Sequence, residues 1–228
     1  MNVYAVSCDP GRADRLRAAA APLGLNIVIV DSPLASDPEV VRRGRTCFER
    51  DSAYPTGMAA TLGHMRAMQR LVDSGDAWAI IIEDDVRFHV AFKEIVASME
   101  TLLDGSVDVI SLGFCNYPGH MDGEVCHING IPFFKNVSLG NPWGAQCYMI
   151  TREYARRFLD IFREDDVSVP YAYKFVTDCV IFDPILGCRR HTLTYPIAVE
   201  SPEEQSLAGN YNKYPMLNDM DPSQFYLH

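Results

Sequence analysis

Basic side chains are scarce in this sequence, and their scarcity excludes one broad class of function. Lys and Arg number 20 against 30 Asp and Glu, which gives a formal net charge of −10. Proteins that bind nucleic acid without sequence preference neutralise its phosphates with many Lys and Arg side chains. We therefore expect no nucleic-acid partner, although a few convergent Arg could still bind a phosphorylated small molecule.

Long apolar runs and paired cysteines are also lacking. No run reaches membrane-spanning length, so we expect no membrane span, and the first residues lack the basic start and apolar stretch of a signal peptide. The seven cysteines are odd in number and contain no Cys-x-x-Cys pair, and Cys126 with His120 and His127 fits no standard zinc spacing. These absences predict a soluble protein of a reducing compartment.

Apolar periodicity predicts one α/β domain over residues 1–228. Hydrophobic residues make up 48% of the chain, enough for one sizeable core. Runs of strand length alternate with segments of helical period, and a strand–helix–strand order is how parallel strands connect. The expected strands are 3–7, 26–30, 78–82, 107–112, 145–150 and 192–199, and the expected helices are 10–21, 57–72, 92–103 and 152–162. Residues 32–56 and 113–131 are expected to be loops, with at most one short helix in the first.

Three acids follow the most apolar of these strands. Ile80, Ile81 and Ile82 lead directly into Glu83, Asp84 and Asp85. Ligands of open α/β sheets bind at the carboxyl ends of the strands. Strand alternation would send Glu83 and Asp85 to one side with Asp84 between them, and a hard divalent cation prefers such carboxylate oxygens. Acids that cap the next helix or face water are the alternative at this stage.

The surroundings of these acids resemble glycosyltransferase family 25, which includes bacterial lipooligosaccharide galactosyltransferases and procollagen galactosyltransferases. The matching segments, in the family's order, are Arg12 with Arg15, Thr61 to His64, Trp78 to Val86, Trp143 to Ala155, Thr177-Asp178, Tyr195-Pro196 and Gln205-Ser206. The family's Ser before His64 is Gly63 here, its Gly-Cys ahead of that pair is Ala59-Ala60, and its Asn-Leu after the first strand is Ser7-Cys8.

The resemblance implies a GT-A-type fold, Rossmann-like, with a mostly parallel sheet flanked by helices. The donor-binding part would span about residues 1–112 and the acceptor side about 113–228. It also implies a cytoplasmic enzyme of glycan or lipopolysaccharide biosynthesis, with attachment to a membrane that bears the acceptor left open. The reaction would be metal-dependent and inverting, moving galactose or glucose from a UDP-sugar to a glycan, lipid-linked or protein acceptor. A non-catalytic protein of this fold that binds a nucleotide-sugar or a glycan is the alternative.

The resemblance also implies roles for individual residues. These are Asp85 and Glu83 for Mn²⁺ or Mg²⁺; Arg12, Arg15, His64, Glu83 and Asp84 for the donor; and Asp178 as general base. Two more candidates come from the residues themselves: His191, which follows two arginines, as a further metal ligand, and Trp143, which could stack on a sugar ring, for the acceptor. Each has a structural alternative: a packed histidine for His64, a helix cap for Asp178, a solvated turn for His191, core packing for Trp143 and a solvated helix face for the two arginines.

Overall fold

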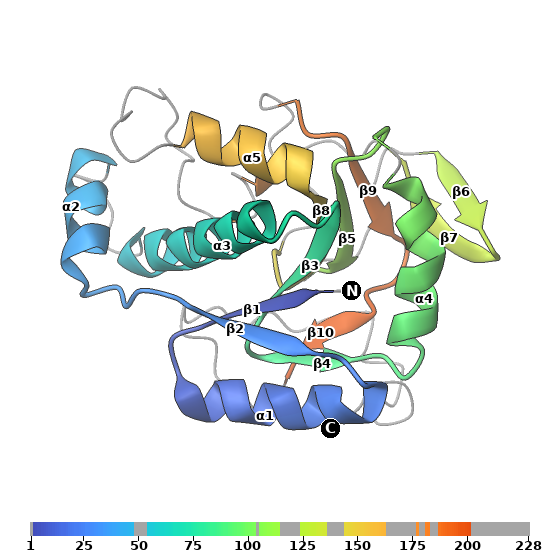
Figure 1. The fold of residues 1–228 in the computed structure, drawn as a ribbon, viewed down its shortest axis with the longest axis horizontal. Helices are drawn as coiled ribbons and strands as arrows, with labels where there is room; N and C mark the ends of the chain where they lie inside the picture. The colour runs from blue at the N-terminus through green and yellow to red at the C-terminus, as the bar shows by residue number, and fades with distance from the viewer. Residues whose placement is uncertain are drawn as a thin grey trace.

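Strands and helices alternate through the first half of the chain (Figure 1). The computed structural model describes residues 2–47, 54–103, 105–114, 124–135, 144–162, 177, 181–182 and 187–201. Its first elements are β1 (Val3–Ser7), α1 (Pro10–Ala20), the 3₁₀ turn η1 (Ala21–Leu23), β2 (Ile27–Asp31), α2 (Pro38–Cys47), α3 (Tyr54–Ser74), β3 (Trp78–Glu83), β4 (Val86–Phe88), α4 (Phe92–Met99) and the 3₁₀ turn η2 (Glu100–Leu102). The later ones are β5 (Val109–Gly113), β6 (Val125–Ile128), β7 (Ile131–Phe134), β8 (Cys147–Thr151), α5 (Arg152–Ile161), β9 (Arg190–Leu193) and β10 (Ala198–Glu200).

The described residues form one eight-stranded sheet in the order β2-β1-β3-β8-β5-β9-β7-β6, with β4 and β10 paired beside it. The β1 strand pairs in parallel with both β2 and β3, and β5 pairs in parallel with β9. The β8 strand runs antiparallel between β3 and β5, and β7 runs antiparallel to its neighbours β9 and β6. Most strands therefore share one direction, and the expected α/β class with a mostly parallel, helix-flanked sheet is confirmed.

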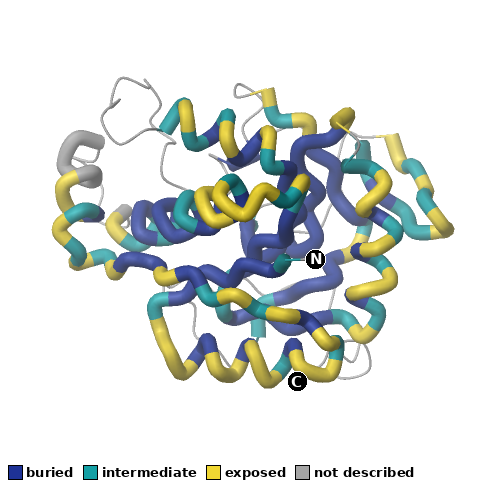
Figure 2. Tube along the Cα trace, in the orientation of Figure 1, coloured by how far each residue is buried: buried dark blue, intermediate teal, exposed yellow. Residues whose placement is uncertain are grey.

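Helices cover both faces of this sheet, so alternate strand residues are buried on opposite sides (Figures 1 and 2). Ile80 and Ile82 pack on the face covered by α1 and α4, whereas Ala79 and Ile81 pack on the face covered by α3 and α5. The core of β3 is completely buried, as its uninterrupted apolar run predicts for a central strand.

Two expected loops contain regular structure. The β6–β7 hairpin falls partly in the predicted loop 113–131, and its turn is Asn129-Gly130, with both residues at positive φ. Such a pair favours a two-residue hairpin turn. The expected strand 192–199 is two separate strands, β9 and β10, with residues 194–197 between them. The expected loop 32–56 contains the helix α2, which agrees with the one short helix allowed there.

Within the described residues, none of the helices combines the length and apolarity that crossing a bilayer requires.

Candidate active site

The carboxyl ends of β1 and its two parallel neighbours form a crevice where the chain changes sides of the sheet. The connection from β1 to β2 passes through α1 on one face, and the connection from β2 to β3 includes α3 on the other. The loops that follow β1 and β2 thus leave toward opposite faces, which separates them at the carboxyl ends of these strands. A ligand site is expected in this crevice on topology alone.

Asp84 and Asp85 form the turn from β3 to β4 in this crevice, and both are paired with Arg12. The Arg12 Nη2 atom lies 3.1 Å from Asp84 Oδ1 and 2.7 Å from Asp85 Oδ2. All three side chains are at most 10% exposed. At the end of β1, Ser7 Oγ donates a 2.6 Å hydrogen bond to Asp84 Oδ2. One guanidinium therefore holds the two acids together.

Arg12 reaches the acids because α1 begins at a fixed place. Asp9 caps the helix, with its Oδ1 accepting hydrogen bonds from the backbone N–H groups of Gly11 at 2.7 Å and Arg12 at 3.2 Å. Pro10 stands at the first helical position, where a missing N–H costs nothing. The sequence-predicted helix start at Asp9-Pro10 is confirmed, and it places Arg12 in the first turn of α1.

Glu83 contacts a different partner from its two neighbours. His64, fully buried on α3, has Nε2 3.5 Å from Glu83 Oε1 and Nδ1 2.8 Å from the hydroxyl of Tyr148 on β8. Strand alternation, the basis for grouping Glu83 with Asp85, ends at Glu83 because Asp84 and Asp85 are turn residues. The acids thus divide into a pair beside Arg12 and one carboxylate beside His64.

A cavity of about 300 Å³ opens onto this cluster. Its lining combines the acids, Arg12, His64, Ser7 and Cys8 with small and apolar residues after β2 and on α3, namely Ser32, Pro33, Leu34, Ala35, Thr56, Ala59 and Ala60. A concave site of this size, with a few convergent polar groups on an otherwise apolar lining, is typical of small-molecule binding.

The negative charge of Asp85 is only partly balanced by Arg12. Burial raises the pKa of Asp85 to about 8, and the nearby charge of Glu83 adds to this, while the Arg12 guanidinium acts in the opposite direction. Among the described residues, its Oδ1 atom is buried and accepts no hydrogen bond. A buried carboxylate oxygen in this condition favours a cation as its missing partner.

The acids fit a hard divalent cation that takes only part of its coordination from the protein. In the part of the chain that the structure describes, no group of three or more His, Cys, Asp or Glu side chains is arranged as a complete metal site. Mg²⁺-like ions usually bind one or two carboxylates and complete their shell with water and substrate phosphates. Asp85 Oδ1 and the partly exposed Glu83 would be the protein oxygens that hold such an ion.

Four other predicted residues lie away from this cluster or outside the described residues. Arg15 is exposed on α1 and is not among the residues that line the cavity. His191 stacks on Phe133 with ring centroids 5.5 Å apart, and it sits on β9, beyond β8 and β5 from the acids, so the structure does not bring it to Asp85 and Glu83. Asp178 and Trp143 fall outside the described residues.

Two residues that the sequence reasoning missed lie beside the acidic turn. Gln146, just before β8, donates a 3.1 Å hydrogen bond to Glu200 Oε1 at the end of β10. The backbone N–H of Ser201 donates to the Asp85 carbonyl, and the charge of Glu200 contributes to the raised pKa of Asp85. Only the long-range pairing of β10 with β4 places Glu200 here, so no local sequence signal could have identified it.

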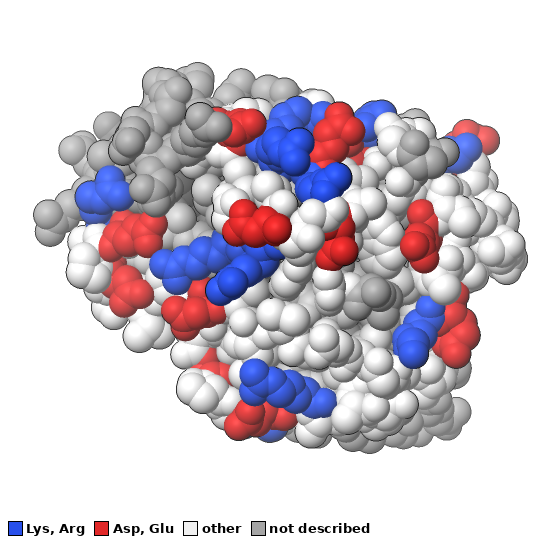
Figure 3. All heavy atoms as spheres, viewed as in Figure 1, with Lys and Arg blue, Asp and Glu red and all other residues white. Residues whose placement is uncertain are grey.

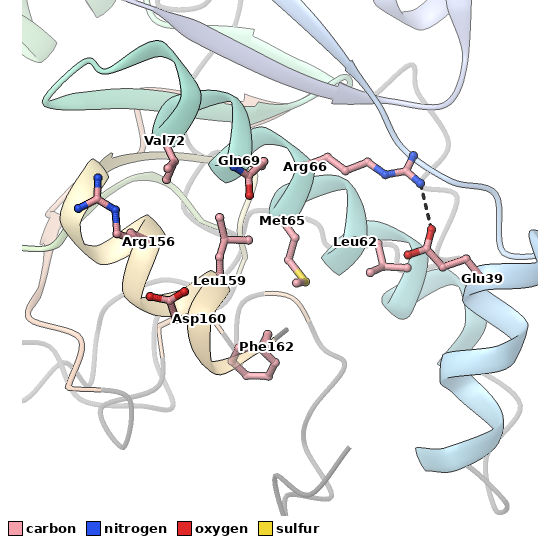
Figure 4. A pocket seen from close by; sticks show the side chains of 10 residues that line it. All are labelled: Glu39, Leu62, Met65, Arg66, Gln69, Val72, Arg156, Leu159, Asp160 and Phe162. Atoms are coloured by element: carbon pink, nitrogen blue, oxygen red, sulfur yellow. Dashed lines mark hydrogen bonds and ion pairs between the residues drawn. The ribbon is translucent and has the colours of Figure 1, made fainter. Parts of the chain in front are cut away.

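A second and larger cavity, of about 610 Å³, lies between α3 and α5 (Figure 4). Its lining mixes Leu62, Met65, Val72, Leu159 and Phe162 with Glu39, Arg66, Gln69, Arg156 and Asp160. Arg66 reaches across to Glu39 at 3.2 Å. The lining residues come from helices α2, α3 and α5 and the residue after α5, not from the carboxyl ends of strands, so this cavity lacks the acid–arginine cluster of the first.

Comparison with known proteins yields structural similarity but no sequence family. No protein-family model and no curated protein matches this chain. One similar solved structure is a glycosyltransferase involved in the glycosylation of the major capsid of PBCV-1, at 11% identity over 89% of this chain and 93% of that one, with a TM-score of 0.44. Another is glucosyl-3-phosphoglycerate synthase from Mycobacterium tuberculosis in complex with phosphoglyceric acid, at 13% identity over 89% and 72%, with a TM-score of 0.42. The family 25 resemblance therefore rests on the sequence motifs alone.

Proposed function

We propose that this chain is a GT-A-type glycosyltransferase that uses a nucleotide-sugar, with the cavity at the carboxyl ends of β1, β2 and β3 as its donor site. The observation that supports this most is the cluster of Arg12 with Asp84 and Asp85 at the chain's change of sides. It joins a cation suited to phosphate with acids suited to a metal ion, and a nucleotide-sugar diphosphate needs both.

The lining of the cavity suggests how a donor would lie. The diphosphate would bind near Arg12 and the acidic turn, and the nucleoside would face the small and apolar residues after β2. Mn²⁺ or Mg²⁺, held by Asp85 and Glu83, would neutralise the charge that develops on the leaving nucleoside diphosphate. We propose a UDP-hexose as the donor, in line with the family 25 resemblance.

The remaining roles rest on the resemblance. Inversion by a single displacement requires one carboxylate to accept the proton of the acceptor hydroxyl, and Asp178 is proposed for this. Its sequence neighbour Thr177 lies with Oγ1 3.2 Å from Thr61 Oγ1, one turn of α3 before His64. A glycan, a lipid-linked glycan or a protein would be the acceptor, with Trp143 as a candidate contact.

Thermal unfolding with UDP, with and without Mn²⁺, tests the donor site. UDP should raise the Tm only with the ion present, by an amount that corresponds to about 2.7 kcal/mol at a hundredfold excess over the Kd. Asp85→Asn should abolish this shift because it removes a proposed ligand charge. Asp14→Asn, the same substitution on the exposed side of α1, should leave it unchanged. No shift in either condition for the unmodified protein would refute the proposal.

Transfer itself is tested by UDP release from UDP-hexoses with a broad acceptor panel. Asp178→Ala should retain the metal-dependent UDP shift and stop release, because the proposed base acts on the acceptor only. Loss of UDP binding in that variant would contradict its role. A protein that binds UDP with metal but releases none with any acceptor would favour the non-catalytic alternative.

A further inference from the structure

The pairing of Arg12 with the acidic turn has a consequence for the order of binding, which rests on the function proposed above. The Arg12 guanidinium is an internal cation that already serves both Asp84 and Asp85 at ion-pair distance. It approaches Asp85 Oδ2 at 2.7 Å, on the same carboxylate whose Oδ1 is the oxygen left for a metal. Two cations on one carboxylate repel each other strongly where burial weakens screening.

A metal ion arriving alone therefore meets a site whose charge is partly neutralised. Asp85 Oδ1 would hold it, while Arg12 occupies the other oxygen of that group. Arg12 would then either stay close to the positively charged ion or lose its ion pairs with Asp84 and Asp85 without gaining another anionic partner. Both outcomes weaken the binding of the ion alone.

A diphosphate removes this conflict because it offers Arg12 a new anionic partner. The planar fork of a guanidinium pairs as well with phosphate as with carboxylate. With Arg12 paired to the diphosphate, Asp84 and Asp85 would be available to hold the ion.

We propose that Arg12 couples the two binding events, so that the ion and the donor diphosphate bind together and each binds weakly without the other. Arg12 is in this view a positioning residue that enforces joint binding. Coupling of this kind is reciprocal, so the factor by which UDP tightens Mn²⁺ must equal the factor by which Mn²⁺ tightens UDP.

Calorimetry of Mn²⁺ alone, UDP alone and each in the presence of the other measures this coupling factor. The unmodified protein should show coupling of at least about tenfold, within the usual range for linked sites. Arg12→Gln should bind Mn²⁺ alone more tightly, because the competing cation is gone, and should bind UDP with Mn²⁺ more weakly. Its coupling factor should therefore fall several-fold. A merely structural role for Arg12 would weaken both ligands.

Two further variants keep the test interpretable. Arg12→Lys retains the charge without the fork, so it should keep the weak binding of Mn²⁺ alone while losing part of the coupling, and it guards against misfolding of the neutral variant. Arg17→Ala, on the exposed side of the same helix and paired with Asp14, should match the unmodified protein.

The outcomes separate the two proposals. If the unmodified protein binds no UDP even with Mn²⁺, the proposed function fails. If it binds UDP with Mn²⁺ but Arg12→Gln and Arg12→Lys both keep its coupling factor, the role of Arg12 is overturned and the function stands. If Arg12→Gln binds Mn²⁺ alone no more tightly than the unmodified protein, the competition by Arg12 is refuted.

Discussion

His64 links the acidic end of β3 to the middle of the sheet. Burial raises the pKa of Tyr148 well above its usual range, so its hydroxyl keeps its proton and can donate it to His64 Nδ1. If Nδ1 accepts this hydrogen bond, the ring hydrogen is on Nε2, which lies 3.5 Å from Glu83 Oε1. We therefore expect the position of Glu83 to depend on a buried residue of α3 and, through it, on a residue of β8.

Removing the Tyr148 hydroxyl should loosen Glu83. We expect Tyr148→Phe to lower metal-dependent UDP affinity several-fold, because His64 loses the contact that fixes its ring, and to destabilise the fold by about 1–3 kcal/mol. Calorimetry and urea unfolding measure the two effects. Tyr154→Phe is the matched control, since its hydroxyl donates 2.6 Å to the Ile181 carbonyl on the same side of the sheet. Tyr154→Phe should lower the free energy of unfolding and leave UDP affinity unchanged. Equal losses of UDP affinity in both variants would contradict a role for Tyr148 in positioning Glu83 through His64.

At the residue scale, five residues singled out from the sequence come together in the structure, and their roles there stay predictions. Glu83, Asp84, Asp85, Arg12 and His64 were identified because they follow strands or stand in a motif, and all of them line one cavity. The division of the acids between Arg12 and His64 could not be predicted, because it depends on where β3 ends.

At the scale of elements, the approach of α3 to the sheet depends on one glycine. A Cβ at Gly63 would lie 2.5 Å from Val6 Cγ1 and 2.6 Å from Ser32 Oγ, well inside normal contact. Any residue larger than glycine would therefore force α3 or its neighbours to shift. The helix packs closely on the ends of β1 and β2, and this packing brings His64, the next residue, to Glu83.

Gly63→Ala should therefore destabilise the protein. Helix propensity alone predicts a gain of about 1 kcal/mol for this change, whereas overpacking against Val6 and Ser32 should cost about 1–3 kcal/mol. Urea unfolding measures whether the free energy of unfolding of Gly63→Ala rises or falls. Arg70→Ala, on the exposed side of the same helix, should stay within about 0.5 kcal/mol of the parent. A more stable Gly63→Ala would show that α3 can move away from the sheet.

Elements with strong periodicity were predicted well, and short ones were not. The β3 strand and α5, which begins at the expected cap Thr151, lie close to their predicted bounds. The β6–β7 hairpin and the strand β4 were missed, and β10 was merged with β9 into one expected strand, because these elements contain too few residues for a period.

At the scale of the whole molecule, charge is dispersed on the face seen in Figure 3, where acidic and basic side chains are interspersed. A more localised cluster lies at the amino end of β5, away from the cavity. Asp108 there is 2% exposed and accepts hydrogen bonds from the Arg189 backbone at 2.9 Å and from its guanidinium, and Arg157 of α5 lies 3.2 Å away. Asp108 thus joins β5, α5 and the start of β9.

This cluster should make the free energy of unfolding depend on pH in the acid range. Burial alone would raise the pKa of Asp108, but the hydrogen bonds from Arg189 and the charge of Arg157 outweigh it, so the pKa is lowered on folding. A lowered pKa contributes stability above the unfolded value of about 3.9, and this is lost as the pH falls through the folded value. Asp108→Asn should cost about 2 kcal/mol at neutral pH and give a shallower loss in acid, measured by urea unfolding across pH. A slope identical to that of the parent would exclude Asp108 as a source of the acid sensitivity; Asp14→Asn should keep the parent's slope.

The antiparallel strand β8 determines how this protein can be assembled during synthesis. It inserts between β3 and β5, and its residues, Cys147–Thr151, leave the ribosome well after both neighbours. Until then, β3 and β5 each expose an unpaired edge of buried, apolar sequence, which is prone to adhere to other chains. A boundary between the proposed donor and acceptor parts near residue 112 would cut through this one sheet. A chain that ended there would lack β8, so β3 and β5 would each keep an open edge.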